Sequence, residues 1–400
     1  MTRDVALQRL AWLATALAFV VIVFGAFVRL SNAGLSCPDW PTCYGKATWP
    51  EQPHDIARAD ARFPDRPVET HKTWREQVHR MLAGSLGILV LALALLVTWP
   101  RRNLRLAIIG AAVAAAIGVG LYIAHEHVAS SVFAAIAIEL PLVVAARLDF
   151  ATPLRIAVAT LAVVILQAML GMWTVTLLLK PIVVMGHLLG GMTTFGLLAY
   201  TALSLSRDGP PLTLAAYRLK PFVVATLVIL ACQIALGGWT SSNYAALACG
   251  FDFPKCLGQW WPPTDFHQGF VLWRQIGVNY EGGVLDLAAR SAIQMTHRIG
   301  ALIVFASVLG LVALLWRRGL RGFACVLCVL LCAQLALGIG NVKLGLPLAV
   351  ATAHNAGAAL LLFTLIALLV RLQPMPASPE AAAEGEGSVA RASPPSRRAE

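Results

Sequence analysis

The stretch QAMLGMWTVTLLLKPIVVMGH, residues 167–187, is repeated in pattern by QLALGIGNVKLGLPLAVATAH, residues 334–354. Both begin with Gln-x-x-x-Gly, continue through apolar residues and end on a histidine. The separation between glutamine and histidine is the same, 187 − 167 = 20 and 354 − 334 = 20. Both histidines continue as His-x-x-Gly, with Gly190 and Gly357 offering a small surface for close helix packing. The repetition predicts two homologous halves.

A second pair of matching sites supports the same division. His79-Arg80 and His297-Arg298 each open an apolar stretch, and each follows a long loop that contains two cysteines. We expect an N-terminal half at residues 1–210 and a C-terminal half at residues 211–371, each built on a four-helix bundle. Residues 372–400, rich in Pro, Ala, Ser, Glu and Arg, are expected to form a disordered cytoplasmic tail.

The composition indicates that much of this chain is surrounded by lipid. Hydrophobic residues make up 58% and charged residues 13%, and the mean hydropathy is +0.73, beyond the range of ordinary soluble domains. Stretches of about 20 apolar residues match a bilayer crossing, and in lipid an isolated segment satisfies its backbone only as a helix. We therefore predict an all-α polytopic membrane protein. The ten expected spans are 11–30, 78–99, 104–124, 128–146, 154–178, 182–204, 221–240, 292–315, 322–340 and 347–370.

The formal net charge of +11 does not indicate nucleic-acid binding, because the basic residues gather at the ends of alternate spans. Under the positive-inside rule, these connections and both termini are cytoplasmic, which places loops 31–77 and 241–291 on the opposite side. The first span runs into Arg29-Leu30-Ser31-Asn32 without a cleavage site, and no transit peptide precedes it. The sequence thus predicts a multi-pass protein of a bacterial inner membrane.

The cysteines fit that orientation. Cys37 and Cys43 lie in the first long loop, and Cys249 and Cys256 lie in the second. In an oxidising compartment, each pair can close a short disulfide ring. Zinc is the competing interpretation, although the spacings differ from the usual ligand gaps. The other four cysteines lie within spans, where small packing residues are common: Cys232, Cys325, Cys328 and Cys332.

Four histidines stand at matching depths in the predicted spans: His79, His187, His297 and His354. An ionisable side chain inside lipid is costly and normally functional. A lone buried histidine is more often a hydrogen-bonded interhelical residue, but repetition in paired positions favours two pairs of axial haem ligands on facing helices.

The two halves differ at one chemically important position. Glu76 stands three residues before His79, whereas Gln294 stands three residues before His297. A spacing of three places each beside its histidine on one helical face. A carboxyl group can exchange protons or stabilise positive charge, whereas an amide can only hydrogen-bond. The alternative is a solvated Glu76 paired with Arg75 or Arg80.

Several motifs together resemble the haem A synthase family of terminal-oxidase assembly over about residues 11–370. They are Gly25-Ala-Phe-Val-Arg-Leu-Ser-Asn-Ala-Gly-Leu-Ser-Cys-Pro-Asp-Trp-Pro-Thr-Cys43, Glu76-Gln-Val-His-Arg80, Leu170-Gly-Met-Trp-Thr-Val175, Gly186-His-Leu-Leu-Gly190, Thr296-His-Arg-Ile-Gly300 and Ala353-His-Asn-Ala-Gly357. The resemblance implies an oxidoreductase of the membrane that converts the C8 methyl group of haem O to the formyl group of haem A.

The resemblance also implies roles for individual residues. His297 and His354 would hold a permanent haem b, and His79 and His187 would hold the porphyrin being oxidised. Glu76 matches the acidic residue associated with catalysis. Arg80 and Arg298 are candidates for contacts to haem propionates, or for side chains that extend to the membrane surface. Candidate partners are haem O synthase, oxidase assembly factors and a second copy of the chain.

One block departs from the family pattern. Residues 104–148 form two extra apolar stretches joined near His125-Glu126-His127, which makes ten spans instead of eight. An even number of crossings leaves the downstream orientation unchanged. We expect a helical hairpin that packs outside the core, and we interpret the two histidines as a polar turn in preference to a metal site.

Two other functions compete with the enzyme. A di-haem b electron-transfer protein of the quinone-oxidoreductase kind would also use four transmembrane histidines, and a haem carrier or chaperone would use the same pockets without chemistry. Neither explains why an acid accompanies only one pair of histidines.

Overall fold

The computed structural model describes residues 2–148, 152–207, 212 and 214–373 of the 400-residue chain. Ten helices of this part are long and apolar enough to cross a membrane, so the predicted all-α polytopic class and the number of spans are confirmed. They are α1 (Arg3–Leu30), α3 (Thr70–Thr98), α4 (Arg102–Ile123), α5 (His127–Ala146), α6 (Thr152–Thr176), α7 (Pro181–Leu205), α9 (Lys220–Ser242), α11 (Leu287–Arg317), α12 (Arg321–Lys343) and α13 (Leu348–Arg371). The shorter helices are α2 (Pro53–Arg62), α8 (Leu214–Tyr217) and α10 (Phe266–Gly269). The predicted tail lies outside the described residues from residue 374 onward.

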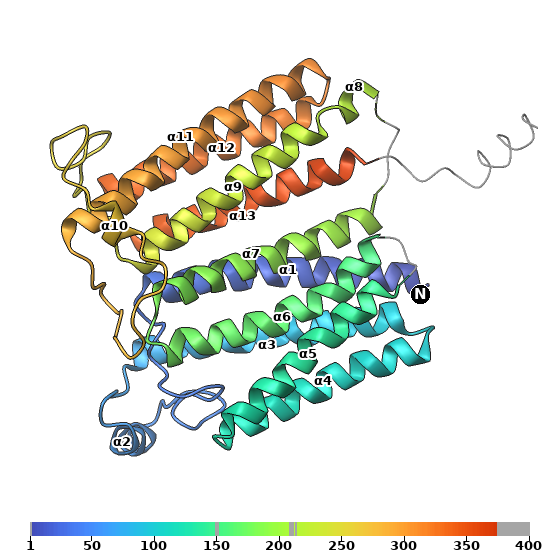
Figure 1. The fold of residues 1–400 in the computed structure, drawn as a ribbon, viewed down its shortest axis with the longest axis vertical. Coiled ribbons are helices and arrows are strands. Elements are labelled where there is room, and N and C mark those ends of the chain that lie inside the picture. Colours follow the sequence, from blue (N-terminus) through green and yellow to red (C-terminus); the bar gives the residue numbers. More distant parts are fainter. Residues whose placement is uncertain (1, 149–151, 208–211, 213, 374–400) are drawn as a thin grey trace, which may run out of the picture.

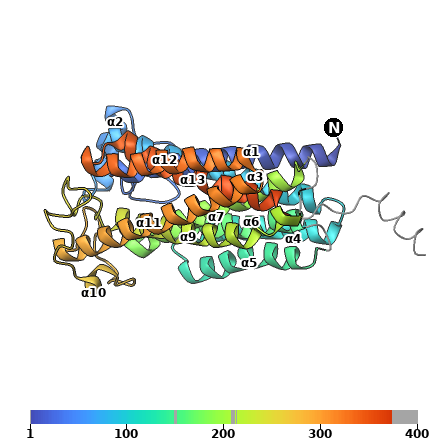
Figure 2. The same ribbon diagram turned by 90° about the horizontal axis from the view of Figure 1, so that it is seen from above.

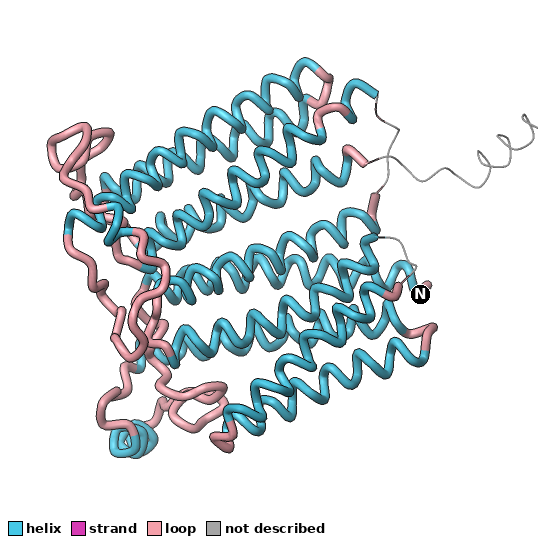
Figure 3. The backbone as a smooth tube through the Cα atoms, viewed as in Figure 1, coloured by secondary structure: helices cyan, strands magenta, loops and turns pink. Residues whose placement is uncertain are grey.

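The ten long helices run side by side, and the long connections gather at one end of them (Figure 1; Figure 3). The connections before α3 and before α11 both lie at this end. The N-terminus and the end of α13 lie at the opposite end (Figure 1). We call the end with the long connections the loop end of the molecule.

Four helices meet at the centre of the bundle. Helix α1 contacts α7 and α13, and α9 contacts the same two helices. Helices α11 and α12 lie beyond this centre on one side, and α3 and α6 lie on the other (Figure 1; Figure 2). Ala11, Ala14 and Ala18 are buried along α1, and their small side chains permit the close helix approach that packing in lipid requires.

The inserted hairpin consists of α4 and α5, and its packing differs from our expectation. Ile108 of α4 and Val144 of α5 are buried within the main hydrophobic core, so the expectation of a hairpin outside the core is wrong. Small residues let the two helices of the hairpin approach each other closely. At Gly118 a Cβ atom would meet the α5 backbone at 3.4 Å, and the Ser130 hydroxyl donates to the Gly118 carbonyl at 2.8 Å. The hairpin packs against α3 and α6 and lines the internal cavity described below.

The helices that carry His79 and His297 begin earlier than the hydropathy pattern predicts. Helix α3 begins at Thr70, where the pattern gave 78, and α11 begins at Leu287, where it gave 292. The side chain of Asp286 caps α11 by accepting from the Ala289 amide at 2.8 Å, which satisfies one free helical N–H group. The first turns of both helices therefore reach into the loop end.

Candidate functional site

One large cavity runs through the middle of the bundle near the loop end. Its volume is about 1840 Å³, above the roughly 300–1,000 Å³ of an ordinary small-molecule pocket. All four predicted histidines line it, and so do Glu76 and Gln294. The structure therefore brings together the residues that the sequence singled out, from α3, α7, α11 and α13.

Each histidine ring lies against a glycine of a neighbouring helix. The four contacts join His79 to Gly25, His187 to Gly171, His297 to Gly237 and His354 to Gly338. A Cβ atom added to these glycines would lie 2.8, 3.2, 3.3 and 3.2 Å from the Cε1 atom of the respective ring. Each glycine therefore provides a seat for one imidazole, and a side chain there would push the ring out of place.

The histidine rings are available as ligands. The His79 and His187 rings lie edge to face with their centroids 6.4 Å apart. Buried Nδ1 atoms of His79, His187 and His354 have no hydrogen-bond partner among the described residues. The fourth ring differs, because the His297 Nδ1 atom lies 3.1 Å from Nε2 of Gln233. A buried polar nitrogen without a partner is costly, so the three unpartnered rings are candidates for contact with a ligand in the cavity. Two imidazoles in each of two pairs fit the axial ligation of two haem groups.

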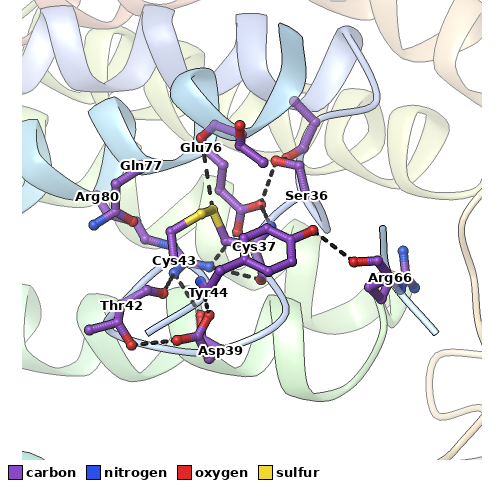
Figure 4. Close-up of a disulfide and its surroundings, with 12 residues drawn as sticks. Ser36, Cys37, Asp39, Thr42, Cys43, Tyr44, Arg66, Glu76, Gln77 and Arg80 are labelled. Atoms are coloured by element: carbon purple, nitrogen blue, oxygen red, sulfur yellow. Dashed lines mark hydrogen bonds and ion pairs between the residues drawn. A yellow bond between two sulfur atoms is a disulfide. The ribbon is translucent and has the colours of Figure 1, made fainter. Parts of the chain in front are cut away.

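Glu76 is buried beneath the first disulfide loop, with 4% of its surface exposed. Its Oε2 atom accepts from the Ser36 hydroxyl at 3.0 Å and from the Cys37 amide at 2.9 Å (Figure 4). Its Oε1 atom pairs with Arg80 at 2.5 Å. The alternative interpretation predicted a solvated Glu76 paired with an arginine. The pairing with Arg80 agrees with that interpretation, but the burial of the side chain contradicts the solvated position.

Gln294 occupies the corresponding position in the other half without such a network. It too is 4% exposed, yet its Oε1 atom has no hydrogen-bond partner within the described ranges. The acid is thus held by three donors, whereas the amide is held by none through its oxygen. The two sites therefore differ in hydrogen bonding as well as in charge.

Both disulfide pairs lie at bonding distance. The sulfur atoms of Cys37 and Cys43 are 1.99 Å apart, and those of Cys249 and Cys256 are 2.01 Å apart. Tyr44 follows the first pair, and its hydroxyl donates to the Arg66 carbonyl at 2.9 Å. Burial raises the pKa of Tyr44 to about 12, so this hydroxyl keeps its proton and its bond at neutral pH.

The arginines that follow His79 and His297 hold these two loops. Arg80 donates to the carbonyls of Cys37, Asp39 and Thr42. Arg298 donates to the carbonyls of Asp252, Pro254 and Lys255. Both guanidinium groups also line the cavity, so a contact with a propionate stays a prediction beside this observed role.

Three glutamines near the histidines make the same contact, which the sequence did not predict. Nε2 of each donates to the main-chain carbonyl of a histidine on the neighbouring helix: Gln167 to His187, Gln233 to His297 and Gln334 to His354. The missing signal was Gln233-Ile-Ala-Leu-Gly237, which has the same Gln-x-x-x-Gly spacing as the two quoted stretches. A long loop separates Gln233 from His297, so this pair lacks the 20-residue spacing of the other two pairs and was not recognised.

The histidines of the inserted hairpin lie apart from these pairs. The His125 and His127 ring centroids are 6.1 Å apart, and the ring of Tyr122, at the end of α4, contacts both the His127 ring and the ring of Trp40 in the first loop. No group of three or more His, Cys, Asp or Glu side chains that could hold a metal ion occurs among the described residues. His125 lies in the turn between α4 and α5 with a φ of 64°, and His127 is the first residue of α5.

The fold and the site define a class of multi-pass helical membrane proteins with two pairs of buried histidines around one internal cavity. Residues 8–123 and 121–366 match the COX15-CtaA family, whose description is cytochrome oxidase assembly protein. The chain belongs to this family, and the resemblance inferred from its motifs is confirmed.

Individual relatives carry a more specific name. The chain is 38% identical to a heme A synthase of Shewanella oneidensis over 355 residues, which cover 87% of this chain and 91% of the relative. It is 26% identical to a heme A synthase of Rhizorhabdus wittichii, with 91% and 93% covered. It is 24% identical to a heme A synthase of Caulobacter vibrioides, with 90% and 94% covered. The matches therefore extend over most of this chain and most of each relative.

Proposed function

We propose that this chain is a haem A synthase, an oxidoreductase that converts the C8 methyl group of haem O to the formyl group of haem A. The observation that carries the proposal is the pairing of histidines in one cavity, with an acid beside one pair and an amide beside the other. A di-haem electron-transfer protein or a haem carrier needs the histidines but not the buried Glu76. The names of the relatives support the same function.

The two pairs take different haem groups in this proposal. His79 and His187 hold the substrate, because Glu76 lies one helical turn from His79. His297 and His354 hold haem b, because their pair lacks an acid. Bound there, haem b would be held by these two imidazoles and would supply one-electron redox chemistry.

Glu76 takes part in methyl oxidation by handling protons and charge. The conversion of the methyl group to the formyl group is a four-electron oxidation, in which an external oxidant takes the electrons and the departing hydrogens leave as protons. A buried carboxylate at the cavity wall can accept a proton or stabilise developing positive charge. Ser36, Cys37 and Arg80 fix its orientation toward the cavity.

The arrangement of the chain supports a location and an orientation. The loop end holds both disulfide rings, which require an oxidising compartment. The opposite end holds the basic connections, which the positive-inside rule assigns to the cytoplasm. We assign the protein to a bacterial inner membrane, with both termini cytoplasmic. Residues 1–210 and 211–371 then form the substrate half and the haem b half.

Co-expression with a source of haem O, followed by extraction and chromatography of the bound haem groups, tests the function. The enzyme should carry haem b together with haem O, haem A or a hydroxylated intermediate. Extracts that contain haem b alone would favour the electron-transfer protein. The same purification shows whether haem O synthase, an oxidase assembly factor or a second copy of the chain accompanies the protein.

A further inference from the structure

Three of the four ligand helices are fastened to a neighbouring helix by the same side-chain bond. In each, a glutamine amide donates to the carbonyl of the histidine residue itself, at 2.9 Å for Gln233 and 3.0 Å for Gln334. The third bond joins Gln167 to His187. Because the bond ends on the backbone of the ligand residue, it fixes the height and rotation of that residue relative to the neighbouring helix.

A glycine notch completes each of these clamps. A Cβ atom built on Gly190, Gly300 or Gly357 would collide with the Oε1 atom of the facing glutamine. Each notch stands three residues after its histidine, and each glutamine stands four residues before the glycine that seats the ring. The clamp is therefore a two-helix motif, Gln-x-x-x-Gly on one helix and His-x-x-Gly on the other.

The His79 pair of helices has the seat but not the clamp. Gly25 lies against the His79 ring, as in the other pairs. Four residues before Gly25 stands Val21, which has no side-chain donor, and three residues after His79 stands Leu82 in place of a glycine. Both parts of the motif are replaced together. Near its start, α3 is held instead by the loop contacts of Glu76 and Arg80.

We infer that His187 is the fixed ligand and His79 the adjustable ligand of the N-terminal pair, and that the porphyrin is exchanged on the His79 side. The inference rests on the proposed function, in which this pair holds a substrate that must enter and leave while the other pair holds a resident haem. Both ligands of the resident haem are clamped. One ligand of the exchanged haem has no clamp, so the residue that carries its imidazole can shift relative to α1 without breaking a glutamine-to-carbonyl hydrogen bond.

Haem release from the full-length protein, loaded with two haem groups and mixed with excess apomyoglobin as acceptor, tests this inference. The unaltered protein should release its haem groups in a fast and a slow phase. The double substitution Val21→Gln with Leu82→Gly installs the clamp and should slow the fast phase by about threefold to tenfold, the range that one interhelical hydrogen bond supports. The slow phase should not change. Leu82→Gly alone, which opens the notch without a donor, is the matched control and should not slow release.

The reverse substitutions keep the test decisive if the installed clamp prevents folding. Gln167→Val with Gly190→Leu copies the first pair into the second and should accelerate the fast phase. Gln334→Val with Gly357→Leu should accelerate the slow phase and alter the low-spin haem b spectrum. Release in a single phase from the unaltered protein overturns the inference, and so does a fast phase that responds to neither Val21→Gln with Leu82→Gly nor Gln167→Val with Gly190→Leu.

The same samples separate this inference from the proposed function. Chromatography of their haem groups shows whether haem A is formed. A protein that forms no haem A but shows the expected release phases overturns the function alone. A protein that forms haem A without those responses overturns the inference alone.

Discussion

Glu76 shows how the surroundings of one carboxylate define its chemistry. The residue lies in the wall of the cavity, and three donors from the first loop and from Arg80 hold both of its oxygens. A glutamine at this position could offer only one acceptor oxygen, and its NH2 group would face donors. Substitution therefore changes both charge and loop contacts, and a control must separate the two.

Changing Glu76→Gln should stop haem A formation, with a loss of about 10²-fold or more if the carboxylate handles protons. The variant should still fold, retain haem b and accumulate haem O or a hydroxylated intermediate. Chromatography of extracted haem groups measures this. Ser36→Ala removes one loop contact and keeps the acid, so it should lose far less activity. If Glu76→Gln makes haem A at the normal rate, or if Ser36→Ala is equally impaired, the role of Glu76 is structural.

The histidines of the second pair carry the next prediction. Replacing His297 or His354 by alanine should remove the low-spin haem b spectrum, because axial ligation needs both imidazoles. His79→Ala, the matched variant of the first pair, should leave that spectrum in place. Absorption and electron paramagnetic resonance spectra of the purified variants measure this outcome. Normal bis-imidazole signals in both His297→Ala and His354→Ala would show that this pair is not the haem b site.

Between helices, glycine seats decide where each imidazole can stand. A Cβ atom at Gly25 would lie 2.8 Å from Cε1 of His79, a distance that forces the ring to move. Gly25→Ala should therefore lower haem A formation, on the order of 10²-fold for a displacement near 1 Å, and leave haem b in place. Gly310→Ala is the control, since a Cβ atom there meets nothing within 4 Å. Equal activity in the two variants would show that the seat is not needed.

The sequence predicted the helices, and singled out four histidines that line one cavity, for a physical reason. Lipid leaves helices as the viable spans, so hydropathy gave all ten, and the histidines were conspicuous because ionisable residues are rare there. The glycine seats and the Gln233 contact escaped notice because they depend on which helices become neighbours. The starts of α3 and α11 were missed for another reason. Their first residues include charged side chains, such as Arg75 and Arg290, and lie before the apolar run that marks a span.

Across the whole molecule, the inserted hairpin changes the environment of one pair of histidines. Helices α4 and α5 pack against α3 and α6 and contribute small side chains to the cavity wall, such as Ala112, Ala115 and Ala134. No equivalent hairpin covers α11 and α12 in the described part of the chain. The N-terminal half is therefore covered by two helices on a side where the described C-terminal half has no equivalent helices.

The final prediction concerns the orientation of the whole molecule. Cys37 with Cys43 and Cys249 with Cys256 should be disulfide-bonded in protein from its native membrane, because both loops lie at the loop end and the positive-inside rule places that end in an oxidising space. Closing rings of this size should stabilise each loop by about 2 kcal/mol. In the first loop, that stability keeps the Cys37 amide on Glu76, so Cys37→Ser with Cys43→Ser should impair haem A formation more than it impairs haem b binding.

Mass spectrometry of non-reduced peptides measures the pairing directly. The four membrane cysteines provide an internal control, because they are free in the structure and should be modified by a thiol reagent in detergent: Cys232, Cys325, Cys328 and Cys332. Free thiols at all four loop positions would contradict the orientation and with it the oxidising environment assigned to the loop end. Disulfide bonds at the two loop pairs, with the four membrane cysteines free, would support the orientation, because a reducing cytoplasm does not maintain such bonds.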